Sequence, residues 1–205
     1  MNPALTLFGQ SLLIGLSIAA PVGQIGVLAI QRTLQFGSAA GLATGLGAAV
    51  ADAVYGAIGA FGVTVLIGWL VEHKALFGAV GAAVLLWLAW RIVRQPPAER
   101  RDGDDPPAAL LRLFAGTFVL TLSNPTTILS FLAVFGALAG RTPQASPWLM
   151  VAGVLVGSAL WWFFLAAAVG RQRTRFDARW QRRVNLASAA LLAGFAVWQI
   201  AQIVA

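Results

Sequence analysis

Long apolar runs without charged residues dominate the pattern of this chain. They cover 5–31, 33–71 (interrupted only by Asp52), 113–140, 142–170 and 184–205. Each run exceeds the roughly 18 uncharged residues that indicate a membrane span. With the turn residues and charges between them, the runs predict an all-α membrane protein of six transmembrane helices. We place these helices at roughly 4–31, 38–70, 75–93, 112–139, 147–170 and 183–204.

Composition excludes an ordinary soluble domain. Hydrophobic residues make up 59% of the chain and charged residues 10%, whereas a soluble domain carries about 25% charged residues. The chain has no cysteine, two methionines and one histidine. Disulfides and thiol catalysis are therefore excluded, and transport of soft metals is disfavoured. We expect no metal site and no cofactor.

The basic residues gather on one side of the predicted bundle. The loops after the first, third and fifth helices hold twelve of the 14 Lys and Arg residues, namely Arg32, Arg91, Arg94, Arg100, Arg101, Arg112, Arg171, Arg173, Arg175, Arg179, Arg182 and Arg183. Lys74 and Arg141 lie on the other side. The positive-inside rule then places the twelve in the cytoplasm and both termini outside. The net charge of +7 thus reflects topology, and we expect no nucleic-acid partner.

Two loops on the predicted cytoplasmic side are distinctive. The polar segment 95–111 contains two proline pairs and separates the halves 1–94 and 112–205, so we expect a flexible linker. The loop before the sixth helix carries Phe176 and Trp180 one helical turn apart among arginines. This loop either lies on anionic lipids as an interfacial helix or only fixes the topology.

The two halves share motifs at nearly equal spacing. Leu16-Ser17-Ile18-Ala19-Ala20-Pro21 matches Leu120-Thr121-Leu122-Ser123-Asn124-Pro125. Gly47-x-x-x-Ala51-Asp52-x-x-Tyr55 matches Gly153-x-x-x-Gly157-Ser158-x-x-Trp161. Because each half has an odd number of spans, the second half would insert upside down. Inverted repeats with interrupted helices are a recurring transporter design, with the substrate site at the repeat interface.

Pro21 and Pro125 lie near the middle of the first and fourth predicted helices. Pro21 precedes Arg32 by about ten residues, which is roughly 15 Å into a ~30 Å core. Proline breaks or kinks a helix and is well placed as the first residue of a new half-helix. Free N–H groups after the break would attract a carboxylate, either those of Val22, Gly23 and Gln24 or those of Thr126, Thr127 and Ile128. The alternative is a kink that only shapes packing.

Asp52 is the one acidic residue that we place inside the membrane. Carrying it there costs roughly 2.5–3.5 kcal/mol on insertion scales. Small residues share its helical face, so we expect the carboxylate to point into the bundle. A buried carboxylate suits a proton-coupled or an ammonium-binding site. The structural alternative is that Asp52 has no transport role and only accepts hydrogen bonds from Tyr55 or a backbone group. In the second half, Ser158 takes the matching position, and Trp161 is expected to wall the site.

Small residues recur at every fourth position on two of the predicted helices. Gly37, Gly41, Gly45 and Ala49 form one such stripe, and Gly153 and Gly157 begin another. Stripes of this kind mostly allow close helix packing. We therefore assign these glycines a structural role.

The same motifs resemble the lysine-exporter superfamily, the LysE/RhtB type of amino-acid effluxer. The resemblance runs from the first-helix proline through Gly37-x-x-x-Gly41 to Asp52, and from Asn124-Pro125 to Gly157-Ser158-Ala159-Leu160-Trp161. It implies a multi-pass protein of the bacterial inner membrane that exports amino acids or related metabolites, driven by the proton gradient. It also implies that Pro21, Asp52, Asn124 and Pro125 belong to a central site. The chain departs from many relatives at Val22-Gly23 and at Thr126.

The sequence thus predicts a secondary transporter with an amino-acid site near the membrane midplane. The substrate carboxylate would meet a half-helix N-terminus, and its ammonium group or an exchanging proton would meet Asp52. The predicted substrate-binding residues are Pro21, Val22, Gly23, Gln24, Asp52, Tyr55, Asn124, Pro125, Thr126, Thr127, Ser158 and Trp161. The alternatives are a channel, a non-transporting scaffold and an intramembrane enzyme, which the lack of paired catalytic groups disfavours. The sequence leaves a monomer and a homodimer open.

Overall fold

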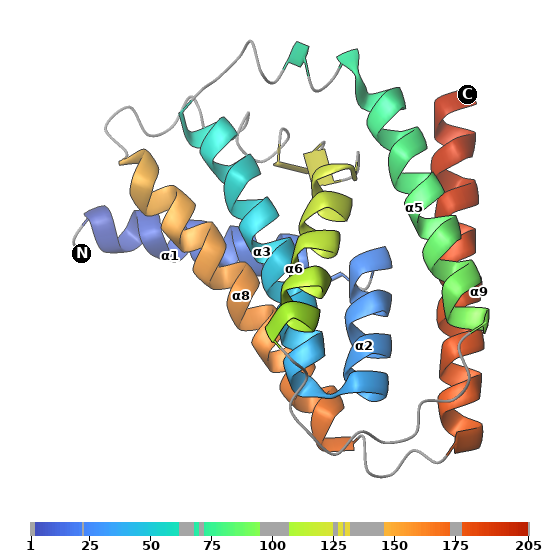
Figure 1. Cartoon of the computed structure of the whole chain (residues 1–205). Coiled ribbons are helices and arrows are strands. Elements are labelled where there is room, and N and C mark those ends of the chain that lie inside the picture. The colour runs from blue at the N-terminus through green and yellow to red at the C-terminus, as the bar shows by residue number, and fades with distance from the viewer. Residues whose placement is uncertain are drawn as a thin grey trace.

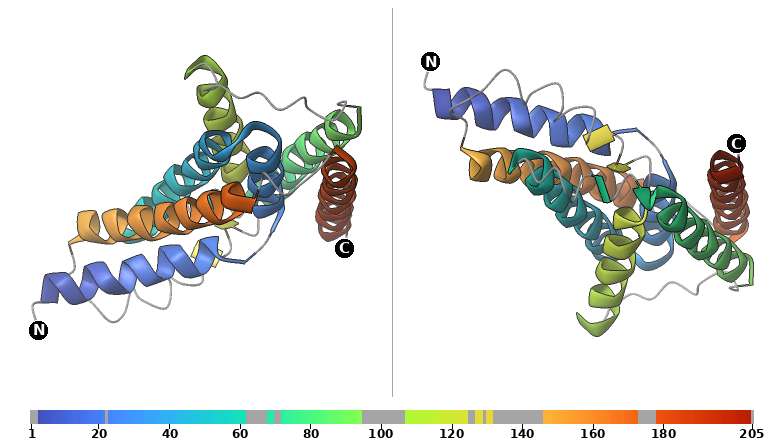
Figure 2. Two further views of the ribbon diagram at one scale, coloured as in Figure 1. Left: turned by 90° about the horizontal axis from the view of Figure 1, so that it is seen from below. Right: turned by 90° about the horizontal axis from the view of Figure 1, so that it is seen from above.

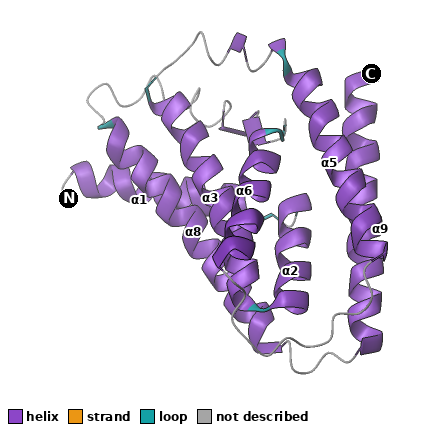
Figure 3. Cartoon of the chain, in the orientation of Figure 1, coloured by secondary structure: helices purple, strands orange, loops and turns teal. Residues whose placement is uncertain are grey.

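The computed structural model describes residues 3–21, 23–61, 68–69, 72–94, 107–124, 127–128, 130–131, 146–172 and 178–204. Within these residues every regular element is an α-helix (Figure 3). The helices are α1 (Pro3–Ala19), α2 (Gln24–Phe36), α3 (Ser38–Ala60), α5 (Lys74–Arg94), α6 (Pro107–Leu122), α8 (Pro147–Gln172) and α9 (Ala178–Val204). The all-α prediction is confirmed for this part of the chain.

Several of these helices have the length and composition of membrane spans. Four qualify alone, namely α3, α5, α8 and the part Arg182–Ala201 of α9. The bent pair α1 and α2 adds a fifth span if the two helices are counted together, and α6 is a shorter apolar helix. The chain is therefore an integral membrane protein. The described residues account for at most five of the six predicted spans, and 132–139 of the predicted fourth helix lies outside them.

The observed bounds of α5 and α8 agree closely with the predicted helices 75–93 and 147–170, whereas the bounds of the other helices differ from the predicted ones. The predicted span 38–70 runs past α3, which ends at Ala60 with Phe61 as its C-cap. Residues 62–67 and 70 of that span lie outside the described part of the chain. Helix α6 begins at Pro107, inside the segment expected to be a linker. Proline suits the first turn of a helix, where its missing N–H would have no intrahelical acceptor. The linker residues 95–106 lie outside the described part of the chain.

The helices pack as one group of four and one pair, with α2 between them. In the group, α1 lies along α8, and α3 lies against both α8 and α6 (Figures 1 and 2). In the pair, α5 lies along α9. The short helix α2 packs on α3 and also touches α8 and α9. These neighbours bury nearly all of α2, namely Gln24–Ala29 and Gln31–Gln35.

Glycines let the helices of the group approach each other at backbone distance. A Cβ atom built at Gly157 of α8 would lie 2.0 Å from the carbonyl oxygen of Leu12 in α1, and one at Gly153 would lie 2.8 Å from that of Phe8. A Cβ atom at Gly47 of α3 would lie 2.3 Å from a carbonyl oxygen of α6. The packing role predicted for Gly153 and Gly157 is confirmed.

The glycine stripe of α3 divides between packing and a turn. Gly41 faces Thr33 of α2, and Gly45 faces Trp162 of α8. Gly37 instead lies between α2 and α3 with a φ angle of 102°. Glycine adopts this left-handed region without the steric cost that a side chain brings, so Gly37 permits the reversal of the chain.

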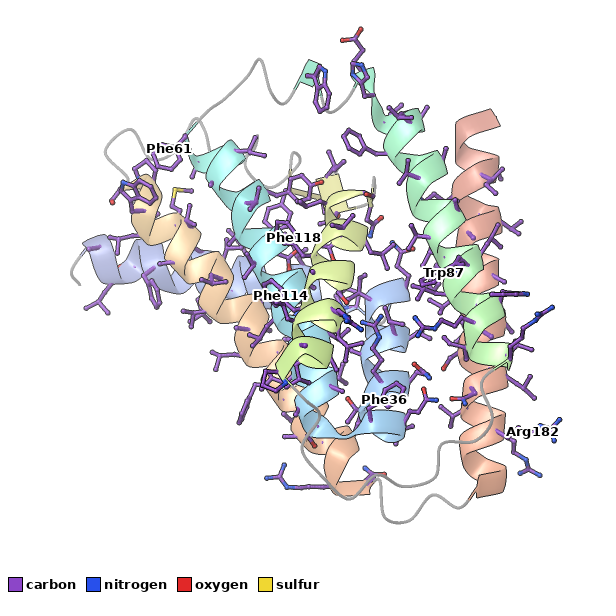
Figure 4. The ribbon with its side chains drawn as sticks, in the orientation of Figure 1. Phe36, Phe61, Trp87, Phe114, Phe118 and Arg182 are labelled. Atoms are coloured by element: carbon purple, nitrogen blue, oxygen red, sulfur yellow. The ribbon has the colours of Figure 1, made fainter. Side chains whose placement is uncertain are left out.

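Large apolar side chains cover the outer faces of the helices. Trp87, Trp90 and Trp198 are exposed on the α5–α9 pair. Near the end of α5, the guanidinium of Arg94 lies 4.4 Å from the ring centroid of Trp90, and Arg91 makes a similar contact with Trp87. Arg182 extends from one end of α9 away from the other helices (Figure 4). Apolar flanks with paired aromatic and basic side chains at their ends are typical of a lipid-facing surface.

Gly157→Ala is expected to lower the stability of the protein, because its Cβ would overlap the α1 backbone. Overpacking of this kind costs about 1–3 kcal/mol. Gly194→Ala is the matched control, since a Cβ there meets nothing within 4 Å and alanine gains roughly 0.5–1 kcal/mol over glycine inside a helix. Thermal unfolding in detergent should move in opposite directions for the two variants. Equal shifts would contradict the close contact of α1 and α8.

Candidate functional site

The first predicted helix is interrupted near its middle. Helix α1 ends at Ala19, α2 begins at Gln24, and their axes differ by 77°. Pro21 lies in the bend and is not the first residue of the new half-helix, because Gly23 is the N-cap. Val22 lies outside the described residues. The interruption is thus observed where the proline predicts it, and the second half-helix begins later than expected.

The free backbone donors of α2 shift with its start. The N–H of Gly23 already bonds the carbonyl of Pro21 at 2.8 Å, so this predicted donor is occupied. The carbonyl of Gly23 accepts from Val27 at 3.0 Å, which is the first helical bond of α2. The N–H groups of Gln24, Ile25 and Gly26 therefore have no acceptor within the helix. These three residues carry the positive end of the α2 dipole.

A second interruption follows α6. The helix ends at Leu122, and the N–H of Asn124 bonds the carbonyl of Thr121 at 3.0 Å. Helical backbone resumes at Thr127 and Ile128, where the N–H of Ile128 bonds the carbonyl of Asn124 at 3.2 Å. Pro125 and Thr126 lie outside the described residues. The fourth predicted helix is therefore interrupted beside Asn124.

A cavity of about 190 Å³ lies where the two interruptions meet α3 and α8. Six of the predicted site residues line it, namely Pro21, Gly23, Gln24, Asp52, Asn124 and Thr127. The volume is several times the roughly 30 Å³ of a water molecule and smaller than the ~300 Å³ at which pockets for drug-sized ligands begin. A small organic solute fits, and Ile25 and Gly26 of the α2 start line the same space.

Asp52 lines the cavity and belongs to a short hydrogen-bond chain across α3 and α8. The hydroxyl of Ser158 donates to Asp52 Oδ2 at 2.8 Å, and Trp162 Nε1 donates to Ser158 Oγ at 3.2 Å. All three side chains are buried. Among the described residues no cationic side chain pairs with Asp52. Within the described residues, the one side chain that donates a hydrogen bond to this carboxylate is therefore the neutral Ser158.

The structural alternative, in which the Tyr55 hydroxyl bonds the Asp52 carboxylate, is wrong. Its hydroxyl donates to the carbonyl of Leu122 at 2.5 Å, which ties α3 to the end of α6. Its ring lies 5.9 Å from that of Phe131. Tyr55 does not line the cavity and supports the second interruption instead.

The indole that lines the cavity belongs to Trp162 rather than to Trp161. Trp161 is half-buried, with its ring 5.8 Å from that of Phe164. The alignment of Trp161 with Tyr55 pointed to the wrong one of two adjacent indoles. Spacing on the helix could have found the right one, because residues four apart share a helical face and Trp162 follows Ser158 by four.

Arg32 lies inside the bundle rather than in a cytoplasmic loop. Its side chain is 9% exposed, and its guanidinium donates to the hydroxyls of Thr44 at 3.0 Å and Thr117 at 2.9 Å. One charged group thus links α2 to α3 and α6. Gln31 and Gln35 beside it are buried as well, but polar residues also suit the loop predicted at 32–37, so no sequence signal separated a loop from a buried position.

Comparison with known proteins decides the family. The family model "LysE type translocator" matches residues 16–202. The chain belongs to this family of translocators. Such proteins transport small solutes and are not enzymes, so the enzyme alternative falls and the expected family resemblance is confirmed.

Three relatives illustrate the range of the family. "Uncharacterized membrane protein YahN" of Escherichia coli is 33% identical over 82% of this chain and 77% of its own length. "Chemotactic transduction protein ChpE" of Pseudomonas aeruginosa is 30% identical over 94% of this chain and 96% of its own. "Putative amino acid efflux protein YcgF" of Bacillus subtilis is 27% identical over 79% of each. No solved structure matches the chain.

Ser158→Ala is expected to destabilise this family member, because it leaves Asp52 Oδ2 and the Trp162 N–H without partners in a buried place. Removing one partner of a buried hydrogen bond leaves the other partner unpaired, and this lowers the free energy of unfolding by about 1–3 kcal/mol. Ser123→Ala is a suitable control, since its hydroxyl only bonds the carbonyl of Val119 one helical turn earlier. Thermal unfolding of both variants beside wild type measures the difference. A loss no larger than that of the control would contradict the network.

Proposed function

We propose that the protein exports amino acids or related small metabolites by alternating access at the cavity beside Asp52. One observation carries the proposal: the cavity combines the positive end of a buried half-helix with a buried carboxylate. An amino acid carries the complementary pair of charges. A site for a purely apolar solute would need neither group.

Each end of the substrate has a counterpart in the cavity wall. The first-turn N–H groups of α2, at Gln24, Ile25 and Gly26, suit a carboxylate because they combine free donors with the helix dipole. Asp52 suits the ammonium group or an exchanging proton. A buried charge without a partner is costly, and no described cation pairs with Asp52. A proton and the substrate ammonium would then compete for this carboxylate, which is the basis of the proposed proton coupling.

Contacts between matching motif positions support two inverted repeats. Asp52 and Ser158 hold the same place in the two motifs, and they bond each other directly. Equivalent residues of a two-fold repeat touch one another only at the symmetry axis. Gly47 and Gly153 also match, and each approaches the backbone of the helix that precedes an interruption, α6 and α1 respectively. We therefore retain six spans in two inverted repeats, and the distribution of basic residues between the loops favours termini on the outside.

The relatives support the direction of transport and the location. The Bacillus subtilis relative is named for amino acid efflux, and the Escherichia coli relative is named a membrane protein. On this basis we assign the chain to the bacterial inner membrane and its activity to export. Arg171, Arg182 and Arg183 are exposed, which fits contact of this segment with anionic lipids.

Asp52→Asn is expected to abolish proton-coupled transport while the protein stays folded. Proteoliposomes loaded with a mixed amino-acid pool would be tested for uptake of individual labelled amino acids, both without a pH gradient (counterflow) and with an imposed pH gradient (coupled transport). Saturable counterflow by wild type identifies a carrier and its substrate, whereas a channel gives no counterflow. Glu72→Gln is the matched control, because it makes the same change on an exposed residue outside the cavity and should transport normally. Full coupled transport by Asp52→Asn would contradict the role of this carboxylate.

The proposed topology can be tested directly because the chain contains no cysteine. Single variants Glu72→Cys and Arg171→Cys place a thiol at exposed positions on opposite proposed sides of the membrane. In intact cells an impermeant maleimide should label Cys at 72 and spare Cys at 171, and both should react after the membrane is opened. Labelling of both sites in intact cells, or of 171 alone, would contradict the assigned orientation.

A further inference from the structure

The hydroxyl of Thr121 is left without a hydrogen-bond partner beside the cavity. Thr121 lies in the last turn of α6 and lines the cavity together with Asp52. Its side chain is 2% exposed. Among the described residues, Thr121 Oγ1 is the one fully buried side-chain polar atom that bonds nothing. Buried polar groups are almost always paired, so an exception next to a cavity calls for a cause.

Other buried threonines in the protein use a local partner that Thr121 does not use. The hydroxyls of Thr33, Thr44 and Thr117 each donate to the carbonyl oxygen four residues earlier, at 2.7, 2.8 and 2.9 Å. Ser123, two residues after Thr121, makes the same bond at 2.9 Å. This back-bond is the ordinary solution for a hydroxyl inside a helix. The Thr121 hydroxyl therefore keeps its hydrogen-bonding capacity, and rotation about the χ1 bond can turn this buried group toward the cavity that the residue lines.

We infer that the Thr121 hydroxyl is a substrate ligand, which donates a hydrogen bond to a carboxylate oxygen of the transported amino acid and selects for solutes with an acceptor there. The inference rests on the proposed function, since it takes the cavity as the substrate site. A carboxylate offers about four lone-pair positions, more than the three N–H groups at the start of α2 can fill. A hydroxyl donor on α6 supplies a further bond, and the cavity of about 190 Å³ admits a small amino acid.

Two properties of Thr121→Val separate a ligand from a structural residue. Valine keeps the shape and removes the hydroxyl. A substrate ligand with no internal partner predicts weaker transport, with a half-saturation concentration about ten-fold higher, as expected when one hydrogen bond to a charged group is lost. It also predicts that the substrate-free protein melts at the same temperature as wild type or higher, because no internal bond is lost and an unpaired polar group is removed. A structural hydroxyl predicts a lower melting temperature.

The experiment compares wild type with Thr121→Val, Thr121→Ser and Ser123→Ala. Counterflow kinetics are measured with the labelled amino acid that wild type exchanges fastest, and melting is measured without and with that amino acid. Thr121→Ser keeps a hydroxyl and should stay within about three-fold of the wild-type half-saturation concentration, since only a methyl group is lost. Ser123→Ala loses a back-bond outside the cavity and should transport with wild-type kinetics. The stabilisation that added substrate gives should shrink in Thr121→Val alone.

Several outcomes would overturn the inference. Wild-type kinetics in Thr121→Val would mean that a water molecule or nothing satisfies the hydroxyl. A substrate-free melting temperature lowered as much as in Ser123→Ala would reveal an internal partner. Loss of transport in Thr121→Ser as large as in Thr121→Val would assign the effect to shape. Absence of any exchange by wild type would contradict the proposed function instead, and the substrate-free melting comparison would then still decide whether the hydroxyl has an internal partner.

Discussion

The structure depends on one constraint, which is that a broken helix cannot expose its backbone to lipid. Between Ala19 and Gln24 the helical hydrogen bonds are interrupted, and the start of α2 leaves N–H groups without intrahelical acceptors. Such groups are tolerated at membrane depth only inside protein or along a cavity. The packing of α1 on α8 and of α2 on α3, α8 and α9 meets this requirement. The cavity is therefore a direct product of the interruption.

Close backbone contact gives the cavity its walls. Glycines at 47, 153 and 157 remove the side chains that would hold α1 and α8, or α3 and α6, apart. The helices that precede the two interruptions are thereby fixed against α3 and α8. Asp52 and Ser158 meet between these two helices, so the acid is held at a set place relative to both breaks. The close helix packing that these glycines allow thus fixes the position of Asp52 in the cavity.

The sequence was most informative where a physical rule acts on a single residue type. Proline marked the first interruption, uncharged runs marked the spans, and glycine marked the close contacts. It was less informative where the outcome depends on the phase of a helix, because one residue turns a side chain by about 100°. This is why Trp161 was expected in place of Trp162. Arg32 was misplaced for another reason, since a rule for loop charges cannot recognise a cation whose partners, Thr44 and Thr117, lie on other helices.

The hydrogen-bond chain from Trp162 through Ser158 to Asp52 also has an optical consequence. Indole emission depends on the polarity and hydrogen bonding around the ring. Trp162 lines the cavity and donates to the hydroxyl that holds the acid, whereas Trp87, Trp90 and Trp198 lie on the outer surface. Any solute that enters the cavity changes the surroundings of this one fluorophore. The fluorescence of Trp162 should therefore respond to a solute bound in the cavity beside Asp52.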